Sequence, residues 1–177
     1  MKKLAKIIVV TGAESTGKST LTESLAKYFK VPFIPEFARK YVENLDRKYN
    51  YEDVLKIAEK QIELLHELKL TDSSVIFIDT WLIITKIWLE VVFKNIPGWL
   101  DKEIKSTFID LFLVCDTDIP WVPDNVRENG GKNRLILQQK YIQQIKEFNF
   151  AYTIISGKNE IRINNAIERI NKLLNYN

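Results

Sequence analysis

A nine-residue segment, GAESTGKST at residues 12–20, constrains the fold more than any other feature of the chain. It fits the pattern G-x-x-x-x-G-K-[ST] and directly follows the apolar run at residues 7–10. Gly12 and Gly17 permit backbone angles that a side chain forbids, so successive N–H groups can turn inward around a phosphate. The segment that follows has apolar residues at positions 21, 25 and 29, which predicts an amphipathic helix with its positive end at the phosphate. The sequence therefore predicts a strand, a phosphate-binding loop and a helix.

The residues of this loop have distinct expected roles. Lys18 is expected to reach the β- and γ-phosphates of a nucleotide, and Ser19 to offer its hydroxyl to Mg²⁺. The residues expected to bind the nucleotide are Gly12, Glu14, Ser15, Thr16, Gly17, Lys18, Ser19 and Thr20.

Apolar runs rich in β-branched residues recur along the chain, and segments of helical period separate them. The runs lie at residues 7–10, 31–34, 75–78, 111–114 and 152–155. Strands that alternate with helices predict a parallel sheet covered on both faces. The clearest helical segments lie at about residues 51–70, 82–93 and 160–174. We therefore expect an α/β fold of the P-loop kinase type, a three-layer sandwich around a five-stranded parallel sheet.

The length of 177 residues suits one well-buried domain, predicted to cover residues 1–177. Residues 120–133, rich in Pro, Asp, Asn and Gly, form the longest loop-like stretch, and we expect a mobile lid at about residues 120–140. The net charge of +3 favours neither nucleic acid nor an anionic membrane as partner. No apolar stretch approaches the ~20 residues that span a bilayer. The sequence leaves the oligomeric state open.

The lone cysteine and the lone histidine are expected to have structural environments. Cys115 lies at the end of an apolar run, which predicts a buried core thiol rather than a reactive one, and a single cysteine fits a cytoplasmic protein. The apolar run after Lys3 breaks at Thr11, too early for a signal peptide. His66 has no second histidine or carboxylate at metal spacing, so we expect a surface or boundary position.

Two carboxylates follow predicted strands at the edge where a ligand is expected to bind. Asp79 ends the run VIFID and is expected to hold Mg²⁺ directly or through water, although it could instead cap the next helix. Glu36 begins the segment EFARKY, with Arg39 within one helical turn. A kinase acting on a sugar hydroxyl needs a carboxylate to accept the proton and a cation to steady the substrate or phosphate. The alternative is a capping glutamate beside a surface arginine.

The segment DIPWVPDNVRENGGKNR places Arg127 and Arg134 on and after the predicted lid. Arginines brought in by a closing lid neutralise charge on the transferred phosphate, whereas the alternative is a solvated basic loop. Trp121 could stack on a base or pack the lid against the core. Trp81 is expected to form a wall of the acceptor pocket, and its alternative is a core position at the start of the next helix.

Taken in order, GAESTGKSTL, PEFARKY, FIDTWLIITKIW and DIPWVPDNVR resemble the nicotinamide riboside kinase domain of the NadR-type NAD-biosynthesis proteins. The resemblance covers nearly the whole chain, and the last three segments are more specific than the widely shared phosphate loop. It implies a P-loop kinase fold, ATP with Mg²⁺ as cofactors, and transfer of the γ-phosphate to the 5′-hydroxyl of a nucleoside. It assigns phosphate binding to Gly17, Lys18 and Ser19, metal and substrate roles to Glu36 and Asp79, and lid roles to Arg127 and Arg134.

Two departures from this family concern the acceptor. Relatives often have Asp-Thr-Asp where this chain has Asp79-Thr80-Trp81, and some have an aromatic residue where this chain has Pro35. The expected acceptor is nicotinamide riboside, giving nicotinamide mononucleotide, and the length predicts that the reaction stops there. The alternatives are another nucleoside or small acceptor, GTP in place of ATP, or a nucleotide-dependent switch ATPase.

Overall fold

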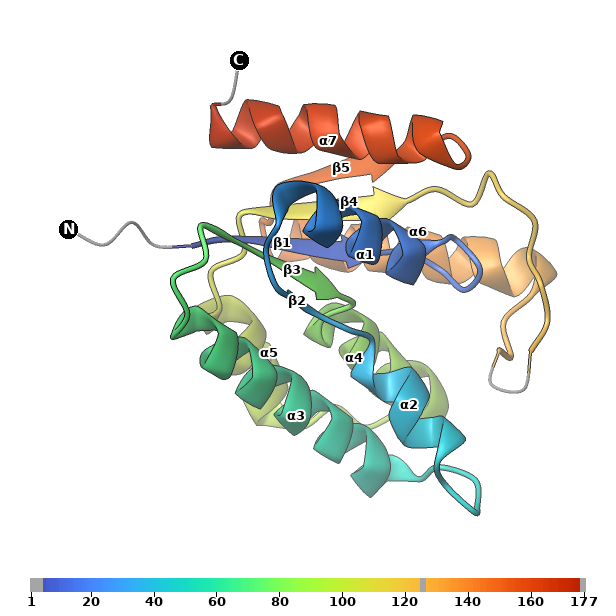
Figure 1. Ribbon diagram of the computed structural model, residues 1–177. Coiled ribbons are helices and arrows are strands. Elements are labelled where there is room, and N and C mark those ends of the chain that lie inside the picture. The colour runs from blue at the N-terminus through green and yellow to red at the C-terminus, as the bar shows by residue number, and fades with distance from the viewer. Residues whose placement is uncertain (1–4, 125–126, 176–177) are drawn as a thin grey trace.

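In the computed structural model, which describes residues 5–124 and 127–175, one parallel sheet has the strand order β2-β3-β1-β4-β5 (Figure 1). The strands are β1 (Lys6–Thr11), β2 (Phe33–Ile34), β3 (Val75–Asp79), β4 (Leu111–Cys115) and β5 (Tyr152–Ile155). All five predicted strands are confirmed, and β2 is shorter than its apolar run. The predicted domain of residues 1–177 includes positions 1–4, 125–126 and 176–177, which lie outside the described residues.

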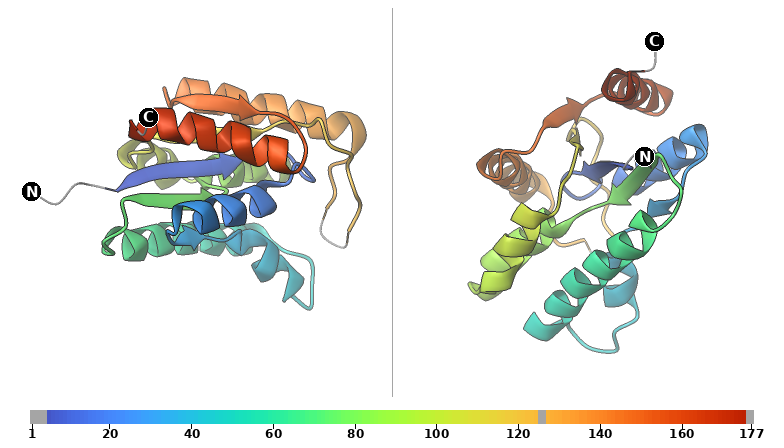
Figure 2. Two further views of the ribbon diagram at one scale, coloured as in Figure 1. Left: turned by 45° about the horizontal axis from the view of Figure 1, so that its top comes forward. Right: turned by 90° about the vertical axis from the view of Figure 1, so that its left-hand side faces the viewer.

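Helices cover both faces of the sheet, which confirms the three-layer sandwich (Figure 2). One face packs against α1 (Lys18–Phe29) and α7 (Glu160–Leu174). The other face packs against α3 (Tyr51–Lys69), α4 (Leu82–Trp88), α5 (Gly98–Ser106) and α6 (Gly131–Glu147). A short helix, α2 (Phe37–Glu43), follows β2, and a π-helical turn, η1 (Leu89–Phe93), continues α4. Among the described residues no helix is long and apolar enough to cross a membrane.

The strands are buried on both sides because their side chains alternate between two cores. In β1, Ile7 and Val9 belong to the core beneath α3 to α6, whereas Ile8 and Val10 belong to the core beneath α1 and α7. Cys115 lies in the second core, free and fully buried, as predicted. Burial raises the pKa of its thiol to about 11, which keeps it protonated at neutral pH.

Helices α2, α5 and α6 were not located from the sequence, and α6 shortens the expected lid. Residues 131–140 lie in α6, so the loop that joins β4 to α6, which we call the β4–α6 loop, ends at Gly130. The buried face of α6 carries Arg134 and Gln138 as well as Tyr141 and Ile145. Because half of that face is polar, the apolar period that predicts an amphipathic helix is interrupted.

The neighbouring strands β1 and β3 send their chains to opposite faces of the sheet. After β1 the chain enters α1 on one face, and after β3 it enters α4 on the other. Such a divergence opens a crevice at the carboxyl ends of the strands, where ligands of open α/β sheets bind. The register pairs Val10 with Asp79, and the N–H of Thr80 donates to the carbonyl of Val10 over 2.9 Å. The end of β3 therefore lies beside the predicted phosphate loop.

Candidate active site

The phosphate loop, residues 12–17, depends on glycine at both ends. Gly12 has φ of 141°, and a Cβ atom there would lie only 2.8 Å from the carbonyl oxygen of Cys115. Gly17 has φ of 77° and is the N-cap of α1. Both values lie in the region that L side chains rarely adopt, as the sequence led us to expect.

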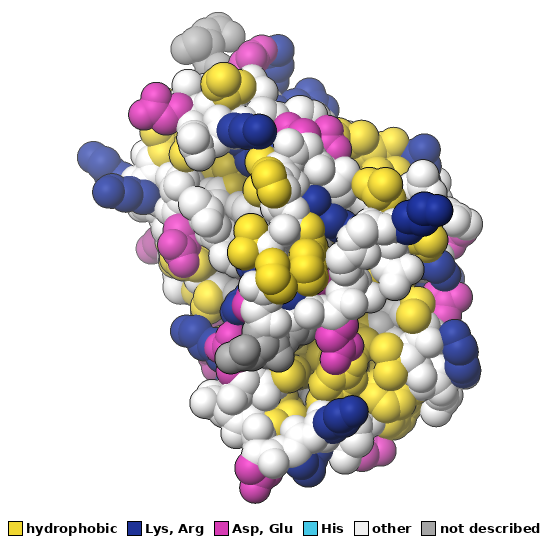
Figure 3. Space-filling model, turned by 90° about the vertical axis from the view of Figure 1, so that its right-hand side faces the viewer, with side chains coloured by type: hydrophobic (Ala, Val, Ile, Leu, Met, Phe, Trp, Pro, Cys, Tyr) yellow, Lys and Arg dark blue, Asp and Glu magenta, His cyan; other side chains and the backbone are white. Residues whose placement is uncertain are grey.

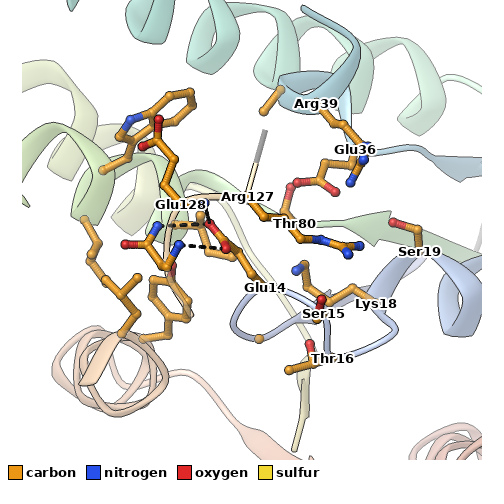
Figure 4. Close-up of a pocket in the computed structure, with 18 of the residues that line it drawn as sticks. Glu14, Ser15, Thr16, Lys18, Ser19, Glu36, Arg39, Thr80, Arg127 and Glu128 are labelled. Atoms are coloured by element: carbon orange, nitrogen blue, oxygen red, sulfur yellow. Dashed lines mark hydrogen bonds between the residues drawn. The ribbon is translucent and has the colours of Figure 1, made fainter. Parts of the chain in front are cut away.

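The side chain of Lys18 lies at the mouth of the loop (Figure 4). Its Nζ donates to the carbonyl of Ala13 over 3.0 Å, and the hydroxyl of Thr16 donates to the same carbonyl over 2.8 Å. The lysine charge is thus held beside the concave side of the loop. This is the position from which an ammonium group can reach the β- and γ-phosphates of a nucleotide.

Asp79 is 2% exposed, and its Oδ1 has no hydrogen-bond partner among the residues that the structure describes. Burial, followed by the charge of Glu36, raises the pKa of Asp79 to about 6, whereas Lys18 and the hydroxyl of Ser19 lower it. A buried carboxylate oxygen without a partner, beside a hydroxyl, fits Mg²⁺. Within the described ranges no three His, Cys, Asp or Glu residues form a metal cluster, so phosphate oxygens and water would complete the coordination of Mg²⁺.

The raised pKa of Asp79 predicts how stability changes with pH in the ligand-free protein. Between the unfolded pKa near 4 and the folded pKa of about 6, the folded state binds a proton that the unfolded state does not, so stability falls as pH rises. Lowering the pH from about 7.5 to about 5.5 in EDTA is expected to stabilise the fold by about 1 kcal/mol, or roughly 2–4 °C in melting temperature.

The matched variant for this measurement is Asp79→Asn, which cannot titrate. Its melting temperature is expected to lack the rise at low pH seen in the wild type. A variant that keeps the full rise would show that another group is responsible.

A cavity of about 310 Å³ lies beside the phosphate loop and extends away from it. At the loop end, Lys18, Glu36 and Arg127 point into the same space from α1, the start of α2 and the β4–α6 loop (Figure 4). The far end is apolar and aromatic, with lining residues that include Tyr49, Ile84, Ile87, Trp88, Val91 and Tyr141. On the face of the molecule that lies to the right in Figure 1, hydrophobic side chains gather next to acidic ones (Figure 3). The cavity thus has a charged end and an apolar end.

Glu36 occupies the N-cap position of α2, but its side chain makes no capping hydrogen bond and lines the cavity instead. The capping alternative is therefore not what the structure shows. Arg39 also lines the cavity, and it donates to Glu43 over 2.9 Å and to Asp124 over 2.7 Å. The hydrogen bond that Arg39 donates to the Asp124 carboxylate is the largest cause of the raised pKa of Arg39. Glu36 and Arg39 are thus brought together at the rim, as predicted.

The two predicted lid arginines lie in different places. Arg127 lines the cavity, pairs with Asp124 over 3.1 Å and donates to the carbonyl of Val122 over 2.6 Å. Asp124 thereby joins Arg127 to Arg39. Arg134, by contrast, is buried behind the phosphate loop and donates to the carbonyls of Glu14, Ser15 and Ile119. Arg134 does not line the cavity, so the prediction that it contacts the transferred phosphate is wrong.

The two tryptophans predicted to contact the substrate pack elsewhere. Trp81 is 1% exposed in the core with Ile83 and Ile87, so its core alternative is the observed one. Thr80, with φ of 65°, lines the cavity in its place. Trp121 donates its indole N–H to Glu14 over 3.3 Å, and its ring lies 3.2 Å from where a Cβ atom on Gly130 would be. Trp121 therefore packs against Gly130 of its own loop and bonds to Glu14 of the phosphate loop.

The core position of Trp81 predicts a large effect on stability. Trp81→Ala is expected to lower the free energy of unfolding by about 3–5 kcal/mol, because it leaves a large cavity beneath α4. Urea unfolding measures this, with Trp99→Ala as a control because Trp99 is partly exposed on α5. A folded Trp81 variant of unchanged stability with an altered acceptor preference would contradict the core assignment.

Glu14 has a role that the motif pattern did not reveal. Its carboxylate accepts hydrogen bonds from the backbone and side-chain amides of Asn129, both over 2.9 Å, and from the N–H of Glu128 and the indole N–H of Trp121, both over 3.3 Å. Position 14 is unspecified in the motif, so only the surplus of donors in the β4–α6 loop could have suggested it. Glu14 fastens that loop to the phosphate loop.

Tyr49 and Trp88 are further lining residues that sequence reasoning missed. Their rings meet edge to face with centroids 4.8 Å apart. Tyr49 comes from the segment before α3 and Trp88 from the end of α4, so their contact depends on tertiary packing.

His66 is exposed on α3, which confirms its predicted surface position.

A phosphate loop at the switch point of a parallel sheet, with two strand-end carboxylates beside it, defines a P-loop protein with the kinase fold. The chain belongs to the AAA domain family, which it matches over residues 7–162. It is similar to the trifunctional NAD biosynthesis/regulator protein NadR of Salmonella typhimurium, with 26% identity over 152 residues, and to that of Escherichia coli, with 23% identity over 175 residues. These matches cover 83% and 96% of this chain but 37% and 43% of the relatives.

Solved structures of NadR and of a nucleoside kinase have the same fold as this chain. NadR in complex with NAD and AMP-PNP superposes with a TM-score of 0.79 at 25% identity, over 97% of this chain and 50% of that one. NadR in complex with NR has a TM-score of 0.78 at 24% identity, over 96% and 52%. A deoxyadenosine kinase from M. mycoides shares the fold, with a TM-score of 0.66 at 13% identity. The resemblance to NadR-type proteins is confirmed, and the chain spans about half of their length or less.

Proposed function

We propose that this chain is an ATP-dependent kinase that transfers the γ-phosphate to the 5′-hydroxyl of a nucleoside, with nicotinamide riboside as its first acceptor. The observation that carries the proposal is that Glu36 and Lys18 enter one cavity whose far end is apolar and aromatic. A phosphate donor at the loop and a ring at the far end would place a sugar between them. The similarity to NadR, whose structures contain NR or AMP-PNP, supports both ligands.

In this proposal each side chain at the charged end has one task. Lys18 offsets charge on the β- and γ-phosphates, and Arg127 offsets charge that develops on the transferred group. Glu36 accepts the proton of the attacking hydroxyl. Ser19 and Asp79 would hold Mg²⁺, which when bound supplies further neutralisation of the phosphate oxygens.

The apolar end of the cavity fits a cationic aromatic ring. The nicotinamide ring of the riboside carries a positive charge, and the faces of Tyr49 and Trp88 attract such a ring. Three carboxylates, from Glu14, Glu36 and Glu128, also line the cavity. An uncharged nucleoside gains less from these groups, which is why nicotinamide riboside ranks first.

The test is an ADP-release assay over a panel of nucleosides with ATP and Mg²⁺. The proposal expects ADP release that depends on the acceptor and is greatest with nicotinamide riboside. A higher rate with another nucleoside would change the acceptor, and ATP hydrolysis indifferent to every nucleoside would indicate a switch ATPase. The predicted cytoplasmic setting stays a prediction.

A further inference from the structure

Three buried side chains from the last third of the chain hold the backbone of the phosphate loop. Gln138 accepts from the N–H of Ala13 over 2.8 Å. Arg134 donates to the carbonyls of Glu14 and Ser15 over 2.9 and 3.0 Å, and Arg162 donates to that of Thr16 over 2.7 Å. Arg134 is 6% exposed and Arg162 4% exposed. Three successive carbonyls of the loop are therefore bound by guanidinium groups.

Holding these carbonyls fixes the direction of the N–H groups next to them. In a trans peptide unit the C=O and the N–H point in opposite directions. Because the carbonyls of Glu14, Ser15 and Thr16 point toward the two arginines, the N–H groups of residues 15, 16 and 17 point the other way. In the part of the chain that the structure describes, no protein group accepts a hydrogen bond from these three donors. They are left for a phosphate.

The charges of the two arginines add to this effect. Arg162 also pairs with Asp118, whereas the hydrogen-bond partners of Arg134 among the described residues are neutral carbonyls. Burial, followed by the charge of Arg162, lowers the pKa of Arg134. Two like charges buried close together cost stability, and a bound polyphosphate on the other side of the loop offsets that cost.

We propose that Arg134 and Arg162 are positioning residues that preorganise the phosphate loop, so that they strengthen the binding of a nucleoside triphosphate without touching it. The inference rests on the proposed function only in taking the ligand of the loop to be a nucleoside triphosphate. A ligand that binds a preorganised loop does not lose affinity to the entropy cost of ordering the loop, so it binds more tightly.

The test measures the dissociation constants of AMP-PNP with Mg²⁺ and of nicotinamide riboside by calorimetry. Arg134→Met is expected to raise the constant for AMP-PNP on the order of tenfold, the scale of a lost hydrogen bond to a charged group, and to leave that for nicotinamide riboside within about twofold. Arg134→Lys and Arg162→Lys are expected to give smaller losses, because an ammonium keeps the charge but lacks the planar fork. Arg169→Met, at an exposed arginine on α7, is the control.

Two results would overturn the proposal: unchanged AMP-PNP affinity in a folded Arg134 variant, or equal weakening of both ligands, which indicates a purely structural role. If Arg134→Met does not fold, Arg134→Lys decides with the same two ligands. If the wild type binds AMP-PNP but no nucleoside, the proposed acceptor fails. The AMP-PNP affinity of Arg134→Lys at unchanged melting temperature then still decides the role of the arginines.

Discussion

Replacing Lys18 by alanine is expected to lower the rate of phosphate transfer by about 10³-fold or more while the fold stays intact. The Lys18 ammonium lies at the mouth of the loop, 3.0 Å from the carbonyl of Ala13. Without it, charge on the β- and γ-phosphates is uncompensated in the transition state. The fold loses only one partly buried hydrogen bond, so the melting temperature is expected to change little.

Turnover is measured as ADP release at saturating ATP and acceptor, together with a melting curve. Lys27→Ala is the matched control, because Lys27 is exposed on the same helix, α1. Near-normal turnover in folded Lys18→Ala would refute the assignment of the loop lysine.

Glu36→Gln is expected to lower turnover by about 10²- to 10⁴-fold without changing the Mg²⁺ requirement. The amide keeps the shape of the side chain at the start of α2 but cannot accept the proton of the hydroxyl. Because the side chain makes no capping hydrogen bond, the substitution is expected to leave α2 stable.

Magnesium titrations of Glu36→Gln and Asp79→Asn separate the two carboxylates. The Asp79 variant is expected to need more Mg²⁺, whereas the Glu36 variant keeps the wild-type curve at a lower rate. Glu59→Gln, at an exposed position on α3, controls for the loss of one negative charge. Identical metal curves for the two variants would show that the carboxylates do not divide the work.

The sheet could be predicted because its strands are buried on both faces. Each then appears as an unbroken apolar run, as in residues 75–78 and 111–114, and no alternation is needed to detect it. The positions of Glu36 and Asp79 followed from the same property, since parallel strands end at one edge. Helix α6 could not be recognised from the sequence because its buried face carries Arg134 and Gln138 beside apolar residues.

The core position of Trp81 could not be predicted from the residues next to it in the sequence. Trp81 lies one residue beyond the position that faces the cavity, and the left-handed conformation of Thr80 decides which residue that is. A β-branched residue rarely adopts this conformation, so the sequence gives no reason to expect it. The contact between Tyr49 and Trp88 likewise joins residues that are distant along the chain, and no spacing rule predicts it.

The hold of Arg134 and Arg162 on the phosphate loop also has a consequence for biosynthesis. The hydrogen bonds from Arg134 to Ser15 and from Arg162 to Thr16 join residues 119 and 146 positions apart. During synthesis the phosphate loop emerges from the ribosome well before the arginines that hold its carbonyls. A nascent chain that ends before α6 already contains the signature GAESTGKST but lacks the groups that orient its amides. Full nucleotide affinity is therefore expected only after α6 and α7 have docked, so a nucleoside triphosphate would bind the folded domain more tightly than its folding intermediates.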